Sequence, residues 1–346
     1  KTVFSLAGGH IDRIYDGFLE YGVRIVDVRH EQAAAMMAHA WSIYGPHAGV
    51  CLVTAGPGYT NALTGVVNAS LDNVPIVVIS GMAPRRDWDR GALQGMNQAA
   101  MLQGLVKWSG VCHDIRRIPE YVAKAFRHAV AGRPGPVLLE IPPDVLNVQV
   151  EEAEVPIPKR GGRVYRSAAD DAAVREAAGL IDAAQKPFLL GGSGVGFSDC
   201  GEALAAFVER TGIPFLLMDN GRGVLPDDHP LSLWDGGQMA LMTALSTADL
   251  IVVFGIRYNW LLMFGQIFPQ AMVVRVDIDA TEIDRNRASD VGLLGDLGLV
   301  LAQLNRAVAK REHGAWLKAL KDMYLPMVAA EVELRVGGRT VNRTFA

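Results

Sequence analysis

The chain has 346 residues, of which 50% are hydrophobic and 20% are charged, and its formal net charge at pH 7 is −4. This length suits two domains with complete hydrophobic cores better than one. The slight negative charge gives no reason to expect nucleic acid or an acidic membrane as a partner, and no uncharged apolar run of about 18 residues predicts a transmembrane span.

Residues 1–150 alternate between apolar, strand-like runs and helical patterns. We expect strands at 2–6, 23–28, 49–54, 75–80 and 136–141, and helices at 11–21, 32–44, 61–71 and 118–131. Uninterrupted apolar strands that alternate with helices are typical of a parallel sheet with helices on both faces. The first domain is therefore predicted to be a doubly wound α/β unit.

A charged stretch that is rich in proline and glycine predicts a linker at residues 151–165. A second alternating block is expected within residues 166–310. Its expected strands lie at 188–190, 214–218, 250–254 and 272–278, and its expected helices at 201–211, 238–245 and 297–309. The predicted fold class is therefore α/β, with two doubly wound parallel-sheet domains.

Both ends of the sequence suggest a longer protein. A strand-like run follows Lys1 directly, without an initiator methionine, and a helical stretch at 314–332 leads to an abrupt stop at Ala346. We expect residues 311–346 to be a helical segment that leads to a C-terminal domain outside this chain.

The three cysteines, Cys51, Cys112 and Cys200, lie far apart and include no Cys-x-x-Cys pair. This spacing predicts buried thiols in a reducing compartment, instead of a disulfide framework or a zinc site. We therefore expect a cytoplasmic protein.

Three strands of the first domain are followed by residues that could contact a ligand. Gly8, Gly9 and His10 follow the first strand, Glu31 follows the second, and a Gly-Pro-Gly turn within residues 54–58 follows the third. The loops after parallel strands share one edge of the sheet, where open α/β folds hold their ligands. A neutral imidazole at a helix start is suited to proton transfer at neutral pH.

Each of these motifs also has a purely structural interpretation. Glu31 suits a helix start because of the helix dipole, His10 could be a surface or hydrogen-bonded histidine, and Asn61 could cap the helix after the turn. Gln94 is an amide that could donate to a substrate carbonyl, or an ordinary loop residue. The coincidence of several motifs at one sheet edge favours a functional site.

The second domain offers weaker signals. Residues 191–196 form a glycine-rich turn between a strand and a helix, which could contact a dinucleotide or a phosphate, or could simply be a turn that needs glycine. Asp277 and Asp279 end a strand, where they could bind a ribose hydroxyl or cap the next helix.

Taken in order, these motifs resemble those of the thiamine diphosphate enzymes of the acetolactate synthase and pyruvate oxidase superfamily. The resemblance rests on residues 29–34, 54–58 with Asn61, 75–81, Gln94, 135–142 with Asp144 and Val145, and 277–279. It implies that residues 1–150 form the pyrimidine-binding domain. It also implies that residues 166–310 form the central Rossmann-like domain, which holds FAD or ADP in some members.

The resemblance implies roles for individual residues. Glu31 corresponds to the glutamate that bonds N1′ of the cofactor aminopyrimidine and thereby activates thiamine diphosphate. His10 and Gln94 correspond to residues that handle the hydroxyl or carbonyl oxygen of the substrate. The expected catalytic residues are therefore Glu31, His10 and Gln94. The expected cofactor-binding residues are Gly9, Glu31, Thr54, Pro57 and Asn61.

The motifs around His10 and Gln94 are most similar to those of benzaldehyde lyase, although that enzyme has a second histidine where this chain has Ala7. Typical acetolactate synthases have a small residue where His10 stands. We therefore expect a thiamine diphosphate-dependent carbon–carbon lyase, carboligase or decarboxylase that acts on 2-hydroxy ketones, 2-keto acids or aldehydes.

Three alternatives stay open. A 2-hydroxyacyl-CoA lyase or an oxalyl-CoA decarboxylase would need basic residues for a CoA or ADP site, and Arg257 and Arg275 are candidates. An acetolactate synthase would bind FAD in the central domain. The chain could also be a truncated, non-catalytic binding module.

Superfamily members hold the diphosphate and Mg²⁺ with a third domain that carries a Gly-Asp-Gly motif and, further on, a pair of asparagines. The nearest fragment here is Gly295 and Asp296, at the end of the central domain. We expect no metal ligand in this chain and place the Mg²⁺ ligands in the C-terminal domain. In this superfamily the two halves of an active site come from different subunits, so a homodimer or homotetramer that acts on a small carbonyl substrate is expected.

Overall fold

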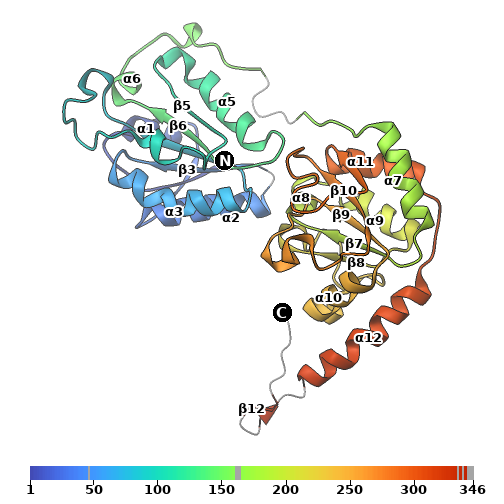
Figure 1. Cartoon of the computed structure of the whole chain (residues 1–346). Coiled ribbons are helices and arrows are strands. Elements are labelled where there is room, and N and C mark those ends of the chain that lie inside the picture. Colours follow the sequence, from blue (N-terminus) through green and yellow to red (C-terminus); the bar gives the residue numbers. More distant parts are fainter. Residues whose placement is uncertain (46, 160–164, 333–334, 337–338, 341–346) are drawn as a thin grey trace. The chain divides into compact units, whose positions relative to one another are not determined.

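The computed structural model of the chain describes residues 1–45, 47–159, 165–332, 335–336 and 339–340. The chain divides between Tyr165 and Arg166 into two compact units (Figure 1).

The first unit is built on a six-stranded parallel sheet with the strand order β2-β1-β3-β4-β6-β5. Its strands are β1 (Thr2–Ser5), β2 (Arg24–Asp27), β3 (Gly49–Val53), β4 (Ile76–Gly81), β5 (Trp108–Val111) and β6 (Val137–Ile141). Every residue of β4 and β6 is buried, as expected for central strands of a sheet that is covered on both faces.

Helices cover both faces of this sheet. They are α1 (Asp12–Glu20), α2 (Glu31–Tyr44), α3 (Pro57–Leu71), α4 (Gln98–Met101), α5 (Ile118–Val130) and α6 (Pro143–Leu146). Apolar residues of α1 and α5 share one core cluster with the strands. Helices α2 and α3 lie side by side (Figure 1), and a Cβ atom on Gly65 of α3 would come within 2.6 Å of the Cβ of Ala35 on α2. The close approach of these two helices therefore needs glycine at position 65.

The second unit is built on a five-stranded parallel sheet with the order β11-β10-β9-β7-β8. Its strands are β7 (Pro187–Gly191), β8 (Phe215–Leu217), β9 (Leu250–Phe254), β10 (Met272–Asp277) and β11 (Val291–Leu294). Its helices are α7 (Asp171–Ala183), α8 (Ser193–Phe197), α9 (Gly201–Thr211), α10 (Gly237–Thr247), α11 (Leu297–Ala307) and α12 (Gly314–Val332). A short antiparallel pair, β12 (Arg335–Val336) and β13 (Arg339–Thr340), follows α12.

Two core clusters hold the second unit together. One joins the sheet to α7, α9 and α11, and the other joins it to α10 and α12. Trp316, Leu320 and Tyr324 of α12 are buried in the second cluster, so much of this helix packs against the sheet domain that precedes it.

The α/β class with two doubly wound parallel-sheet domains is confirmed. The sequence patterns do not predict β5, β11 or α7. Strands β5 and β11 lie at sheet edges and are only partly buried, so they lack a continuous apolar run. In α7 the buried face is rich in alanine, which weakens the contrast between its two faces. Residues 160–164 of the expected linker lie outside the described residues.

Candidate functional site

The loops after β1, β2 and β3 bring the candidate residues to one edge of the first sheet. Because these strands are parallel neighbours, their carboxyl ends lie together. His10 follows β1, Glu31 follows β2, and Thr54 follows β3. All three side chains are buried or nearly so, although each is polar.

Glu31 is the first residue of α2, and only 6% of it is exposed. The residue before it, His30, caps the helix by accepting a hydrogen bond from the backbone N–H of Gln32. Asn61 Nδ2 donates to Glu31 Oε2 at 2.9 Å. Among the described residues, Glu31 Oε1 has no hydrogen-bond partner, so this oxygen keeps its capacity to accept a hydrogen bond.

Asn61 is not a helix cap. Helix α3 begins at Pro57, earlier than the sequence pattern indicated, because proline suits the first turn of a helix, where its missing N–H is not needed. Asn61 therefore lies one turn inside α3, and the contact between α2 and α3 brings it to Glu31.

The Gly-Pro-Gly turn is shaped by close approaches of the chain. Gly56 has φ 58° and ψ −113°, a conformation that favours glycine, and a Cβ there would lie 2.8 Å from the Cβ of Gln94. A Cβ on Gly58 would lie 2.6 Å from Thr54 and 3.1 Å from Glu31 Oε1. The absence of a side chain at Gly56 lets the turn lie against Gln94, and its absence at Gly58 lets the turn lie against Thr54 and Glu31 Oε1, while Pro57 between them is exposed.

His10 is held from two sides. Its Nδ1 lies 3.2 Å from Thr54 Oγ1. A Cβ on Gly81, at the end of β4, would come within 2.4 Å of the Cβ of His10, so β4 ends directly against it. Gly9 is exposed, and a Cβ there would meet nothing within 4 Å, so the chain leaves open space beside this residue.

Gln94 lies in the loop between β4 and α4 with a φ of 56°, which is uncommon for a residue with a side chain. Its Oε1 atom is buried and has no hydrogen-bond partner within the described part of the chain. An unpaired buried polar atom next to a strained backbone is typical of a site that is completed by a ligand.

The structure also reveals two residues that the sequence analysis missed, Gln98 and Glu140. Both are almost fully buried, and Gln98 Nε2 donates to Glu140 Oε1 at 2.8 Å. Burial raises the pKa of the Glu140 carboxyl, and the hydrogen bond from Gln98 opposes this shift. The one sequence signal for Glu140 is a charged residue inside the apolar strand β6, because such a residue needs a buried partner.

In the second unit, the glycine-rich turn at 191–196 is explained by packing within the chain. A Cβ on Gly192 would collide with Ile256, and one on Gly194 would collide with the backbone of Gly255. One on Gly196 would lie 2.1 Å from the carbonyl oxygen of Asn220. The geometry therefore favours a turn that needs glycine, and α8 after it has only five residues.

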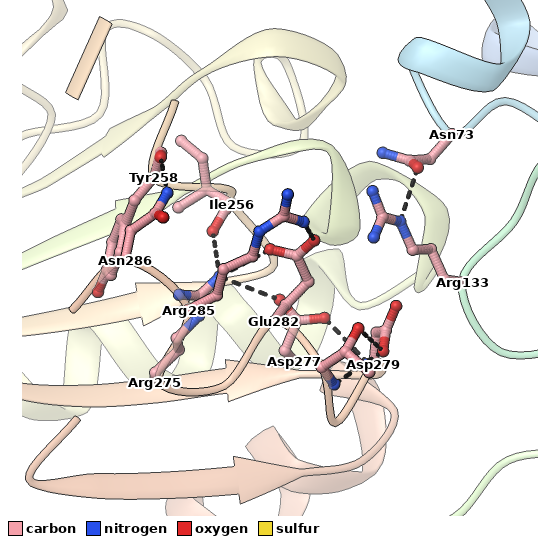
Figure 2. A network of polar contacts seen from close by, with 11 residues as sticks. Asn73, Arg133, Ile256, Tyr258, Arg275, Asp277, Asp279, Glu282, Arg285 and Asn286 are labelled. Carbon is pink, nitrogen blue, oxygen red and sulfur yellow. Dashed lines mark hydrogen bonds and ion pairs between the residues drawn. The ribbon is translucent and has the colours of Figure 1, made fainter. Parts of the chain in front are cut away.

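Arg275 is not the surface cation that a CoA or ADP site would use, because it is fully buried. Figure 2 shows its side chain beside Glu282 and Asp277. Its Nη2 lies 3.6 Å from Glu282 Oε2 and 3.7 Å from Asp277 Oδ2, and it donates to the carbonyl oxygen of Ile256. Its guanidinium also stacks 4.4 Å from the ring centre of Tyr258. Arg257, by contrast, is exposed.

The two aspartates at the end of β10 belong to the same network. Asp277 accepts a hydrogen bond from the backbone N–H of Asp279 (Figure 2). Asp279 accepts hydrogen bonds from the backbone N–H and the hydroxyl of Thr281. Burial raises the pKa of the Asp277 carboxyl. Both aspartates therefore stabilise the turn after β10.

Within the described residues, no group of three or more His, Cys, Asp or Glu side chains is arranged to hold a metal ion. The described helices include none that is both long and apolar enough to cross a membrane.

Two family models match the sequence. The thiamine pyrophosphate enzyme N-terminal TPP binding domain matches residues 1–101, and the thiamine pyrophosphate enzyme central domain matches residues 174–304. The first match includes His10, Glu31 and Gln94, and the second lies entirely within the second unit.

The chain is also similar to curated proteins. It is 34% identical over 342 residues to 2-hydroxyacyl-CoA lyase 1 of Homo sapiens, which covers 96% of this chain and 58% of that protein. It is 36% identical over 344 residues to an acetolactate synthase large subunit of Parasynechococcus marenigrum, with 93% and 55% covered. It is 32% identical over 317 residues to 2-hydroxyacyl-CoA lyase of Arabidopsis thaliana, with 88% and 54% covered. The chain thus spans somewhat more than half the length of these relatives.

Proposed function

We propose a function from the family of this chain, which belongs to the thiamine pyrophosphate enzymes. The chain is part of a thiamine diphosphate-dependent enzyme that makes or breaks a carbon–carbon bond beside a carbonyl group. In that protein the first unit would bind the aminopyrimidine ring, and the sheet edge with Glu31 would be its half of the active site. When bound, thiamine diphosphate supplies a carbon nucleophile and an electron sink for this chemistry.

The pairing of Glu31 with Asn61 carries the proposal. Asn61 occupies Oε2 of the buried carboxylate and leaves Oε1 without a hydrogen-bond partner among the described residues. These residues fit an aminopyrimidine, because a ring nitrogen that can be protonated would share its proton with the unpaired Oε1. Glu31 would thus hold the ring and keep a proton at its nitrogen, while Asn61 fixes the orientation of the carboxylate.

His10 and Gln94 would act on the substrate. Thr54 fixes the imidazole ring of His10 through Nδ1. When Nδ1 carries the proton and donates to Thr54, Nε2 is a free base that can take a proton from a substrate hydroxyl and return it. Gln94 would accept a hydrogen bond from a substrate hydroxyl through Oε1, which is unpaired among the described residues.

We propose 2-hydroxy ketones, 2-keto acids or aldehydes as the substrates, in a cleavage or carboligation of the benzaldehyde lyase type. His10 supports this choice, because a base beside the cofactor is useful when the substrate carries a hydroxyl group. Acetolactate synthase activity is less favoured, since typical members of that group are expected to have a small residue at this position.

A 2-hydroxyacyl-CoA lyase is the second candidate. The human relative with that name aligns with 96% of this chain, and its name specifies a substrate with a hydroxyl next to the acyl carbon. Because Arg275 is internal, Arg257 is the remaining arginine of the two that could meet a CoA or ADP phosphate.

The superfamily resemblance supports two further proposals. Mg²⁺ would hold the diphosphate through residues outside this chain. The protein would be a homodimer or homotetramer, with each active site between subunits. The three free, buried cysteines support a cytoplasmic location. FAD in the second unit would favour the acetolactate synthase alternative, and a yellow purified protein would reveal it.

Calorimetric titration of the full-length protein with thiamine diphosphate in the presence of Mg²⁺ tests the proposal. Binding is expected for the wild-type protein and for Glu20→Gln, a control at an exposed glutamate of α1. Glu31→Gln should lower the rate of carbon–carbon bond cleavage or formation by about a hundredfold or more, because the amide cannot share a proton with the ring. Failure of the wild-type protein to bind the cofactor would refute the proposal that it is a thiamine diphosphate-dependent enzyme. A fully active Glu31→Gln variant would refute the role of Glu31.

A further inference from the structure

Gln98 connects three segments near the candidate catalytic residues, namely the turn after β3, the end of β4, and β6. It is only 1% exposed, although it belongs to the short helix α4. Its Oε1 accepts a hydrogen bond from the backbone N–H of Gly56 at 2.8 Å, in the turn after β3. Its Nε2 donates to the carbonyl oxygen of Gly81 at 2.9 Å, at the end of β4, and to Glu140 Oε1 at 2.8 Å, in β6.

The orientation of this amide is determined by its partners. The backbone N–H of Gly56 can only donate and the carbonyl oxygen of Gly81 can only accept, so Oε1 must face Gly56 and Nε2 must face Gly81. Glu140 takes up the second proton of Nε2, and Ser80 Oγ lies 3.2 Å from the same nitrogen. A side chain without both an acceptor and a donor cannot make this set of bonds.

Each backbone segment that Gln98 holds lies directly behind a candidate catalytic residue. Gly56 is so close to Gln94 that a Cβ would lie 2.8 Å from the Gln94 Cβ. Gly81 is just as close to His10. The turn that starts at Gly56 also carries Gly58, which lies against Glu31 Oε1. Among the described residues, Gln98 makes no hydrogen bond to the side chains of Glu31, His10 or Gln94, so any effect on the reaction would pass through these backbone segments.

The hydrogen-bonded pair of Gln98 and Glu140 also borders a cavity. A cavity of about 440 Å³ is lined by Gln98 and Glu140, together with apolar residues such as Met82 and Trp88. When the bonds of Gln98 are lost, its side chain has room to turn toward this cavity. The loss should therefore move the turn and the end of β4 without collapsing the core, which lies on the faces of the sheet.

We infer that Gln98 is a positioning residue, whose amide, anchored by Glu140, sets the spacing between the Gly56 turn and the Gly81 strand end and thereby aligns Glu31, Gln94 and His10. This inference rests on the proposed function. It assigns a role in the reaction to a residue that touches neither the cofactor pocket nor the substrate side of the site.

Gln98→Glu in the full-length protein is the test, with Gln103→Glu as the control at a nearby exposed glutamine. The substitution places two carboxylates side by side and removes the donor to Gly81. We expect kcat to fall by about tenfold to a hundredfold, as for a small misplacement of catalytic groups, with KM changed by less than about threefold. The affinity for thiamine diphosphate should fall too, since Gly58 lies in the turn that Gln98 holds and borders Glu31 Oε1. The melting temperature should also fall, because two buried carboxylates then lie side by side, so the kinetics are measured well below it.

The double variant Gln98→Glu, Glu140→Gln gives the decisive comparison. It restores a carboxylate–amide pair and keeps an acceptor for the backbone N–H of Gly56, but it does not restore the donor to the Gly81 carbonyl. The double variant therefore removes the repulsion between two carboxylates without linking the two backbone segments again. A kcat that stays at least about fivefold below wild type in the double variant, although its melting temperature recovers, would support the positioning role. Unchanged kcat in Gln98→Glu, full recovery of kcat in the double variant, or a loss of activity that follows the melting temperature in both variants would overturn it. A wild-type protein that binds no thiamine diphosphate would overturn the proposed function and this role together, whereas cofactor binding with an unaffected Gln98→Glu variant would overturn only this role.

Discussion

At the scale of single residues, the candidate site depends on polar groups that are only partly satisfied by the chain. Glu31 shares one oxygen with Asn61 and keeps the other free, and Gln94 keeps a buried amide oxygen unpaired among the described residues. An unpaired buried polar atom such as Gln94 Oε1 is destabilising by about 1 to 3 kcal/mol. A ligand that forms a hydrogen bond with it recovers this free energy on binding.

His10 provides the residue-scale test. Replacing His10 by alanine removes the base but leaves Glu31, Asn61 and the Gly-Pro-Gly turn in place. We expect kcat for a hydroxyl-bearing substrate to fall by about a hundredfold, with little change in thiamine diphosphate affinity. Steady-state kinetics and calorimetry on the same variant measure both quantities. His47→Ala, at an exposed position, is the control, and an unchanged kcat in His10→Ala would remove His10 from the mechanism.

At the scale of elements, the site depends on how α3 begins. The turn from β3 into α3 passes through Gly56 with φ 58° and ψ −113°, so that Pro57 can open the helix and Asn61 can reach Glu31 one turn later. Such a conformation costs a residue with a side chain about 1 to 3 kcal/mol, and at Gly56 the collision with Gln94 adds to this cost.

A comparison of Gly56→Ala with Gly132→Ala separates the cost of the backbone conformation from the cost of the collision with Gln94. Gly132 has the same φ of 58°, but a Cβ there would meet nothing within 4 Å. Gly132→Ala should lower the free energy of unfolding by about 1 kcal/mol, whereas Gly56→Ala should lower it by more than about 2 kcal/mol. Gly56→Ala should also weaken thiamine diphosphate binding. Equal destabilisation of the two variants, measured by denaturant unfolding, would show that the contact with Gln94 is not tight.

At the scale of the whole molecule, the two units have separate cores. The cluster of the first unit and the two clusters of the second unit have no residue in common. Domains with their own cores can unfold in separate steps. Cofactor binding at Glu31 should therefore stabilise the first unit directly.

Calorimetric unfolding of the full-length protein checks this independence. Val77→Ala removes buried volume from the core of the first unit, and Phe207→Ala from that of the second. Phe207→Ala should destabilise its unit by about 3 to 5 kcal/mol, and Val77→Ala should have a smaller effect, each on a different transition. Thiamine diphosphate should raise the midpoint temperature of the same transition whose midpoint Val77→Ala lowers. A single transition that both variants shift equally would show that the units unfold together.

The sequence by itself determined the parallel α/β class, most of the strands and helices, and the group of motifs at one sheet edge. These follow from local patterns: apolar runs, glycine turns and polar residues at strand ends all act over a few residues. The edge strands β5 and β11 and the alanine-rich α7 could not be predicted, because their local patterns are weak and only neighbouring elements bury them.

Only the tertiary structure decided which side chains meet. It placed Asn61 on Glu31, where the sequence pattern also allowed a helix cap. It buried Arg275 against Glu282, and it brought Gln98 to Glu140 across 42 positions of sequence. The physical reason is that a buried polar group must find a partner, and the sheet topology determines which distant residue provides it. Periodicity in the sequence indicates that a residue is buried, but only packing determines what it contacts.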